Sequence, residues 1–175
     1  MFKIIDQKNR NAFEEDISCF FSLECKDKLA SDGQAYDHSH SVYIMHEDPH
    51  TGLKAGARLN PMTSKNLTSD TLKRYVKGFE TAGVWECSLM VFHLEDAHPI
   101  YDDTRAFHRL CNQYYENFRE TMITACVRFK IGTLLFFGYQ DEIENLQYFG
   151  EMTFKPKLAL EDNLCIALFQ NPHRH

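Results

Sequence analysis

LKAGARLNPMT (residues 53–63) and VWECSLMVFH (residues 84–93) are the two stretches of this sequence that decide its fold. Each has the short, mainly apolar pattern that favours a β-strand. The first carries one arginine, Arg58, and the second carries one glutamate, Glu86. Because a charge inside a sheet is costly unless it is paired or used in chemistry, these two residues are the first candidates for a functional site.

Alternation along the second stretch predicts which side chains share a face of the sheet. One face would carry Trp85, Cys87, Leu89 and Val91, and the other would carry Glu86, Ser88, Met90 and Phe92. Since both faces are mainly apolar, we expect this strand to lie inside the sheet. Arg58 on a neighbouring strand can pair with Glu86, and both a structural ion pair and a catalytic carboxylate remain open as explanations.

The length and composition indicate one folded domain over residues 1–175. The chain has 175 residues, of which 43% are hydrophobic, including 14 Phe and 8 Tyr. A chain of this size buries roughly 70% of its unfolded surface. The net charge of −6 argues against broad nucleic-acid binding, which needs a basic face.

Targeting signals and cysteine usage indicate a cytoplasmic protein. The first residues, MFKIIDQKNR, lack the apolar run of a signal peptide, and no stretch reaches the ~20 apolar residues that span a membrane. The six cysteines are scattered without a CxxC pair, as buried small residues of a reduced chain would be.

The remaining apolar patterns alternate between strands and helices. Strands are predicted at 2–5, 41–47, 53–61, 84–94, 121–127, 147–154 and 164–171. Helices are predicted at 9–30, 69–83, 102–120 and 128–139. This order predicts an α/β (mixed α+β) protein whose mixed central sheet has helices on both faces.

The common catalytic and metal motifs are missing. The sequence has no GxGxxG, GxSxG or HExxH. Nine histidines are present, but none has zinc-ligand spacing supported by cysteines, so we predict no metal site. Six cysteines and nine histidines allow many Cys–His pairs, and none stands out.

Several of these segments together resemble one enzyme family. The matching stretches are QAYDHSHSVYIM (34–45), AGARLNPMTSKNLTSDTLKRYVKGF (55–79) with WECS (85–88), and ITACVRFKIGTLLFFGY (123–139). They follow in the order found in acyl-homoserine-lactone synthases, the LuxI-type autoinducer synthases. The resemblance covers most of the chain through short motifs. It implies the fold of the GNAT acyltransferases, a three-layer α-β-α sandwich.

The resemblance assigns roles to individual residues. Arg58, Glu86 and Asp37 match the family's strand arginine, essential glutamate and loop aspartate, and they would be catalytic. Thr124 matches a position that contacts the acyl chain, and Ser88, Met90 and Phe92 would bind substrate with it.

The sequence also departs from the family at several positions that mostly serve S-adenosylmethionine. Phe21, Cys25, Ser31, Gln34 and Leu89 replace family residues there. Arg10 is a candidate to supply a cation that Phe21 and Leu89 do not.

The resemblance implies an acyltransferase for quorum-sensing signal synthesis. The acyl chain would pass from an acyl-carrier protein or acyl-CoA to the amine of S-adenosylmethionine or a related acceptor, with no permanently bound cofactor. Arg128, Lys130, Lys155 and Lys157 would form a basic landing patch for an acidic carrier. The alternative is a non-catalytic acyl-binding or regulatory module that keeps the fold.

Overall fold

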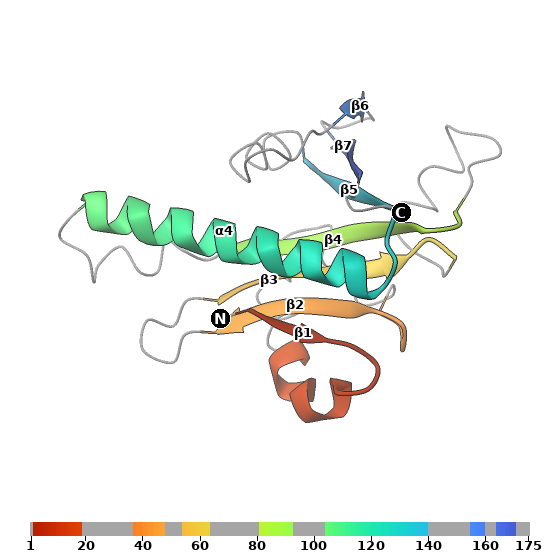
Figure 1. The fold of residues 1–175 in the computed structure, drawn as a ribbon, viewed down its shortest axis with the longest axis horizontal. Helices are drawn as coiled ribbons and strands as arrows, with labels where there is room; N and C mark the ends of the chain where they lie inside the picture. Colours follow the sequence, from red (N-terminus) through yellow and green to blue (C-terminus); the bar gives the residue numbers. More distant parts are fainter. Residues whose placement is uncertain are drawn as a thin grey trace.

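A computed structural model describes residues 2–18, 37–47, 54–63, 81–92, 104–139, 155–159 and 164–170. Its centre is a seven-stranded sheet in the order β1-β2-β3-β4-β5-β7-β6 (Figure 1). The strands are β1 (Lys3–Ile5), β2 (Val42–Glu47), β3 (Lys54–Pro61), β4 (Val84–Phe92), β5 (Thr133–Tyr139), β6 (Lys155–Ala159) and β7 (Leu164–Gln170).

The sheet is mixed, as the sequence predicts. β1 to β4 pair antiparallel in chain order, and β5, β7 and β6 also pair antiparallel. The two groups meet through the parallel pair of β4 and β5. A parallel connection needs a long crossover, and helix α4 (Thr104–Arg128) lies between these two strands in the chain.

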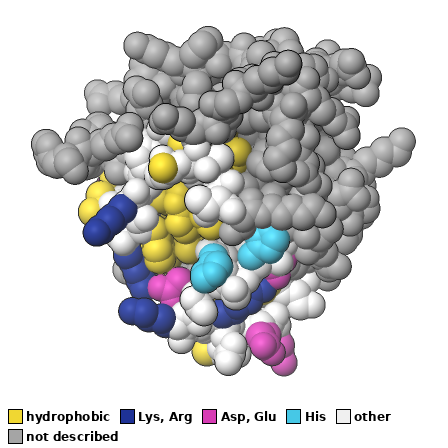
Figure 2. Space-filling view, turned by 90° about the vertical axis from the view of Figure 1, so that its right-hand side faces the viewer, with side chains coloured by type: hydrophobic (Ala, Val, Ile, Leu, Met, Phe, Trp, Pro, Cys, Tyr) yellow, Lys and Arg dark blue, Asp and Glu magenta, His cyan; other side chains and the backbone are white. Residues whose placement is uncertain are grey.

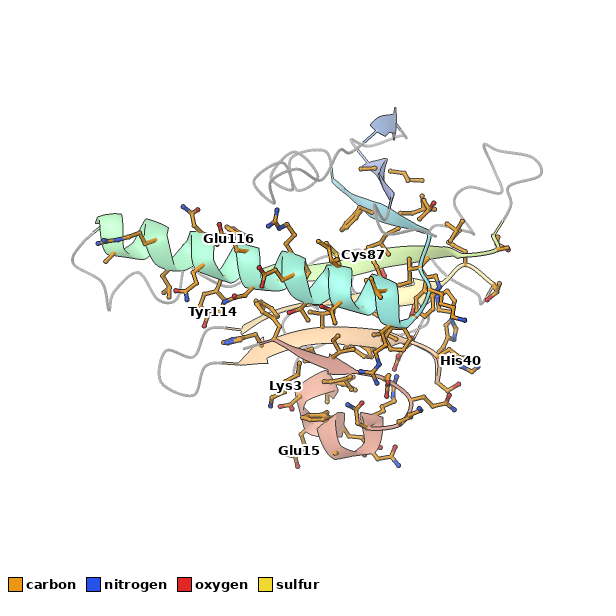
Figure 3. All side chains as sticks on the ribbon, in the orientation of Figure 1. Lys3, Glu15, His40, Cys87, Tyr114 and Glu116 are labelled. Carbon is orange, nitrogen blue, oxygen red and sulfur yellow. The ribbon has the colours of Figure 1, made fainter. Side chains whose placement is uncertain are left out.

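Helix α4 lies across one face of the sheet and covers its apolar side (Figure 1). Phe118, Met122, Ala125 and Cys126 repeat at the spacing of one helix face, and all four are buried. They pack on side chains from β2 to β5 and β7, including Val42, Ile44, Ala57, Leu59, Cys87, Leu134, Phe136 and Ala167. In Figure 3, Tyr114 and Glu116 lie on opposite sides of α4, with Tyr114 toward the strands.

The opposite face of the sheet is also covered by helical residues. The 3-10 helix η1 (Arg10–Phe13) continues into helical residues 14–18. Ile17 and Phe13 pack against Ile5 and Tyr43, which alternate with the residues that meet α4. Helical segments therefore lie on both faces, and the three-layer α-β-α arrangement is confirmed.

Two of the predicted elements are wrong. Residues 121–127 continue α4 and form no strand, because the apolar stripe through Met122 and Ala125 extends the helix face that Phe118 begins. The predicted helix at 128–139 is instead a turn followed by strand β5. Leu134, Leu135 and Phe136 are all buried, as in a strand covered on both faces, and such a run has no helical period.

Some expectations lie outside the described residues, and one strand was not expected. The predicted helix 69–83 falls there except for its last three residues, as do the predicted strand 147–154 and residues 19–30 of the first helix.

β6 was not predicted because KPKLA contains a proline. Proline is tolerated in edge strands, and β6 is the edge of this sheet. No helix in the described ranges has the length and apolar content that crossing a bilayer requires.

Gly83 joins the starts of the parallel strands. Its φ is +68°, a left-handed conformation that side chains with a Cβ rarely adopt. Its carbonyl accepts hydrogen bonds from the backbone N–H groups of Gly132 (2.9 Å) and Thr133 (3.2 Å). The turn before β4 is thereby tied to the first residues of β5.

We expect Gly83→Ala to lower the free energy of unfolding by about 1 kcal/mol through backbone strain alone. A Cβ built at Gly83 meets no atom within 4 Å, so no steric clash contributes. Gly83→Asn is the matched control, because asparagine tolerates this conformation better and should lose less. Urea denaturation measures both, and equal losses would contradict the strain explanation.

Candidate functional site

Five buried polar side chains share the face of the sheet that α4 does not cover. Tyr43, Arg58 and Ser88 are direct cross-strand neighbours on β2, β3 and β4, and Asn60 is the neighbour of Glu86. Each is at most 2% exposed, and we call these five residues the polar row. A buried row of this kind needs its members to satisfy one another.

Arg58 is the centre of the polar row. Its Nη2 donates a hydrogen bond to Ser88 Oγ at 3.1 Å, and Tyr43 is its direct cross-strand neighbour on the other side. Burial lowers the pKa of Arg58, whereas the neighbouring Tyr43, Glu86 and Asp37 act in the opposite direction. An arginine remains charged at neutral pH under such conditions, so the row holds a buried positive charge.

Asp37 links the polar row to the surface. It accepts a hydrogen bond from Tyr43 Oη at 2.6 Å and forms an ion pair with Arg10. Burial and this hydrogen bond both raise the pKa of Tyr43 well above its ordinary value. The side chains of Asp37 and Arg10 are 20% and 23% exposed, so this end of the site reaches solvent.

Arg10 supplies the cation at this end. It donates from Nη1 to the carbonyl of His38 at 3.0 Å, and its guanidinium lies 5.5 Å from the centre of the Tyr43 ring. It comes from η1, so the helical layer and the loop before β2 meet at Asp37. A residue of this first helical segment therefore provides a positive charge beside the loop aspartate.

Ser41 ties the same loop to the other end of the polar row. Its hydroxyl donates to Asn60 Oδ1 at 2.6 Å and accepts from the backbone N–H of His38 at 2.9 Å. Ser41 is buried. Two connections, through Tyr43 and through Asn60, thus fix the loop against the sheet.

Beyond Glu86 the same face becomes apolar. Glu86 is the cross-strand neighbour of Leu135 on β5. Leu135 packs with Met62, Ile166 and Val84 in a cluster separate from the core under α4. The face therefore changes from polar to apolar where β4 meets β5.

β4 and β5 separate close to this boundary. Their parallel ladder ends at Cys87 and Phe136, although β4 continues to Phe92 and β5 to Tyr139. Figure 1 shows the two strands diverging from their common start. The pairing of β4 with β3 also shifts by one residue between Gly56 and Arg58. Past the end of the ladder, the facing edges of these described strands leave backbone groups outside their mutual hydrogen bonding.

The structure brings together the three predicted catalytic residues and one of the predicted substrate-binding residues. Arg58, Glu86 and Ser88 lie in the polar row, and Asp37 reaches it through Tyr43. Met90 and Phe92 belong to β4, but their side chains lie outside the described part, and the register shift interrupts the strict alternation assumed for them. The departures Phe21, Cys25, Ser31 and Gln34, and the side chain of Leu89, also lie outside it.

Thr124 does not join the site. It is exposed on α4, which covers the other face of the sheet, and its hydroxyl donates to the carbonyl of Glu120 at 2.9 Å. The expectation came from the motif resemblance, and the structure gives Thr124 an exposed position on helix α4 instead.

The four cations predicted to bind a carrier do not form one patch. Arg128 pairs with Asp6, which follows edge strand β1, whereas Lys155 and Lys157 belong to β6 at the other edge, on the order of 30 Å away at the usual strand spacing. Lys130 is exposed in the turn after α4. Figure 2 shows basic side chains beside acidic ones and histidines on the described part of one end of the molecule.

Tyr43 and Asn60 are site residues that the sequence analysis missed. In SVYIMHE, Tyr43 reads as one more core aromatic, and only its cross-strand position beside Arg58 reveals its role. Asn60 could have been recognised from the sequence, because it is a polar residue two positions from Arg58 in an otherwise apolar strand.

Thiol and metal chemistry gain no support from the described residues. Burial raises the pKa of Cys87 well above its ordinary value and that of Cys126 to about 12, so both thiols are protonated at neutral pH. Within the described ranges no group of three or more His, Cys, Asp or Glu side chains is placed to hold a metal ion.

Comparison with solved structures identifies proteins of the same fold. BjaI, described as a CoA-dependent acyl-homoserine lactone synthase and solved with SAM and isopentyl-CoA, matches with a TM-score of 0.69 and 17% identity over 99% of this chain and 84% of BjaI. MesI, also described as CoA-dependent, matches with a TM-score of 0.61 and 12% identity over 99% of this chain and 90% of MesI. Apo TofI matches with a TM-score of 0.50 and 14% identity.

The chain therefore has the fold of acyl-homoserine lactone synthases, as the resemblance of its motifs predicts. No family model matches the chain, and no curated protein is similar to it in sequence.

Removing one charge of the polar row should lower the free energy of unfolding more than removing both of its opposite charges. Arg58→Met leaves Glu86 buried without its cationic neighbour and should cost about 3–5 kcal/mol of unfolding free energy. Adding Glu86→Gln should recover part of this loss, because the uncompensated carboxylate is then gone. Arg109→Met, at an exposed position on α4, is the control and should change stability little. Chemical denaturation of Arg58→Met, Glu86→Gln, the double variant and Arg109→Met tests this, and additive losses in the double variant would contradict the coupling.

Proposed function

We propose that this protein is an N-acyltransferase of the acyl-homoserine lactone synthase type. The observation that carries the proposal is the position of Glu86 and Arg58. Both are fully buried in the polar row, beside the apolar cluster of Leu135 and at the place where β4 and β5 separate. A thioester whose acyl chain enters between diverging strands would present its carbonyl to these groups.

Glu86 is the proposed general base. An amine must lose a proton before it can attack a thioester, and a carboxylate can take that proton directly or through one water. The amine nitrogen forms the new C–N bond while the C–S bond breaks. The leaving thiolate then takes up a proton, which the protonated Glu86 can return. Backbone N–H groups at the strand divergence are placed to stabilise the negative charge that develops on the carbonyl oxygen.

The two ends of the site suit the two substrates. The apolar cluster of Met62, Val84, Leu135 and Ile166 favours an acyl chain. The polar end, with Arg58, Asp37 and Arg10, offers charges of both signs for an acceptor that carries both an amine and a carboxylate, as S-adenosylmethionine does. With that acceptor, the carboxylate would close the lactone and release methylthioadenosine.

A coenzyme A thioester is the proposed donor. The predicted basic patch for a carrier protein is divided between the two edges of the sheet. BjaI and MesI, which share the fold, are both described as CoA-dependent. Acyl-CoA is therefore the donor to test first, with acyl-carrier protein as the comparison.

Glu86→Gln should reduce acyl transfer at least about 100-fold, since a positioned general base contributes this much or more. The assay follows thiol release from acyl-CoA with S-adenosylmethionine present, and mass spectrometry identifies the product. The melting temperature should fall less than in Arg58→Met, because Tyr43 and Asp37 remain beside the guanidinium.

Glu116→Gln is the matched control, since Glu116 is exposed on α4 on the side away from the sheet (Figure 3). Unchanged turnover in Glu86→Gln would refute the assigned base. Acyl-CoA binding by the wild-type protein without transfer to any amine would favour the non-catalytic binding module.

A further inference from the structure

Tyr43 lies between two charged groups of the site, Asp37 and Arg58. Its side chain is fully buried, its Oη donates to Asp37, and Arg58 is its direct cross-strand neighbour. Arg10 lies over its ring. No other member of the polar row is shown to join Asp37 to Arg58.

The direction of these hydrogen bonds follows from the chemistry of a phenol. A tyrosine hydroxyl has a single proton, and Tyr43 gives it to Asp37 Oδ1 at 2.6 Å. Its oxygen is therefore left to accept from the neighbouring Arg58, whose nitrogens are all donors. Arg10 donates to the second oxygen of Asp37, which holds that carboxylate in place. Hydrogen-bond donation in this series therefore runs in one direction, from Arg58 to Tyr43 and from Tyr43 to Asp37.

This order limits the orientations of the Arg58 guanidinium. One Nη donates to Ser88 at 3.1 Å on the β4 side, and the Tyr43 oxygen is the acceptor beside the group on the β2 side. Because a guanidinium is planar, two donor directions on different strands fix its plane. Without the Tyr43 oxygen, only the hydrogen bond to Ser88 on β4 would still orient the guanidinium.

We propose that Tyr43 is a positioning residue that fixes the guanidinium of Arg58 for the reaction, and that Asp37 and Arg10 act on Arg58 through Tyr43. This inference rests on the proposed acyl transfer for its catalytic consequence. It assigns Asp37 a part in orienting Arg58, through a phenol that the motif resemblance did not single out.

The first test measures the guanidinium itself and needs no substrate. In ¹⁵N-labelled protein, the Arg58 side-chain signals are assigned by their loss in Arg58→Lys. Rotation about the Nε–Cζ bond of Arg58 should be at least about tenfold faster in Tyr43→Phe, since a hydrogen bond to a charged group is lost. Tyr114→Phe, a buried tyrosine against the α4 face of the sheet, should leave the rotation unchanged. An unchanged rotation in Tyr43→Phe would overturn the inference.

The second test measures the consequence for turnover. Tyr43→Phe should lower kcat about 10- to 100-fold and leave the KM for acyl-CoA within about twofold, because it affects orientation at the reacting end. Asp37→Asn should also lower kcat, and the double variant should be no slower than Tyr43→Phe alone if both act through one series of bonds. Multiplied losses, or an unchanged kcat in Tyr43→Phe, would overturn the inference.

The two tests separate failure of the inference from failure of the proposed function. If the wild-type protein transfers no acyl group, the proposed function fails, and the rotation measurement still decides whether Tyr43 positions Arg58. If Tyr43→Phe folds poorly, Asp37→Asn replaces it in the rotation measurement, with the same expected direction and the same contradicting result.

Discussion

The buried guanidinium of Arg58 is the constraint on which the rest of the structure depends. A charge that is removed from water requires hydrogen bonds and opposite charges around it. Here they come from Tyr43 on β2, from Ser88 and Glu86 on β4, and from Asp37 before β2. A slip of one residue in any of these strands would turn its polar groups to the other face and leave Arg58 among apolar side chains. The charge therefore specifies the register of three strands.

The two faces of the sheet divide structural and chemical roles because of this register. Every polar member of β2, β3 and β4 that is buried beside Arg58 faces away from α4. The other face presents Val42, Ala57 and Cys87 to α4, where hydrophobic burial stabilises the fold. Hydrophobic burial against α4 stabilises the fold, and this offsets the cost of burying charged groups on the other face. The series from Arg10 to Arg58 therefore lies in a part of the molecule that the core supports but does not need for its own packing.

The sequence predicts the parts of this arrangement that follow from short-range pattern. Strands β2, β3 and β4 are short, mainly apolar stretches, and an arginine and a glutamate in them are conspicuous. Residues 121–127 were misassigned because Thr121, Ile123 and Val127 favour a strand locally, whereas the helix is set by an apolar stripe that starts before them. Tyr43 could not be recognised from the sequence, because its importance comes from which residue lies beside it on β3. Thr124 was assigned from a short motif match, and such a match does not show which face of the sheet the matched residue occupies.

The location of the polar row favours chemistry over stability as its explanation. Replacing buried opposite charges with apolar residues of similar size is often neutral or stabilising, so Arg58 and Glu86 can set the register of the strands without being required for the stability of the sheet. A purely structural pair could lie at any interior position. This pair lies where the face changes from polar to apolar and where the β4–β5 ladder ends, which is the place at which a thioester could bring its carbonyl between two strands. The change of the face from polar to apolar and the end of the β4–β5 ladder are properties of the strands rather than of the two charged residues. Both occur beside Glu86, which is the position that the proposed base for amine attack requires.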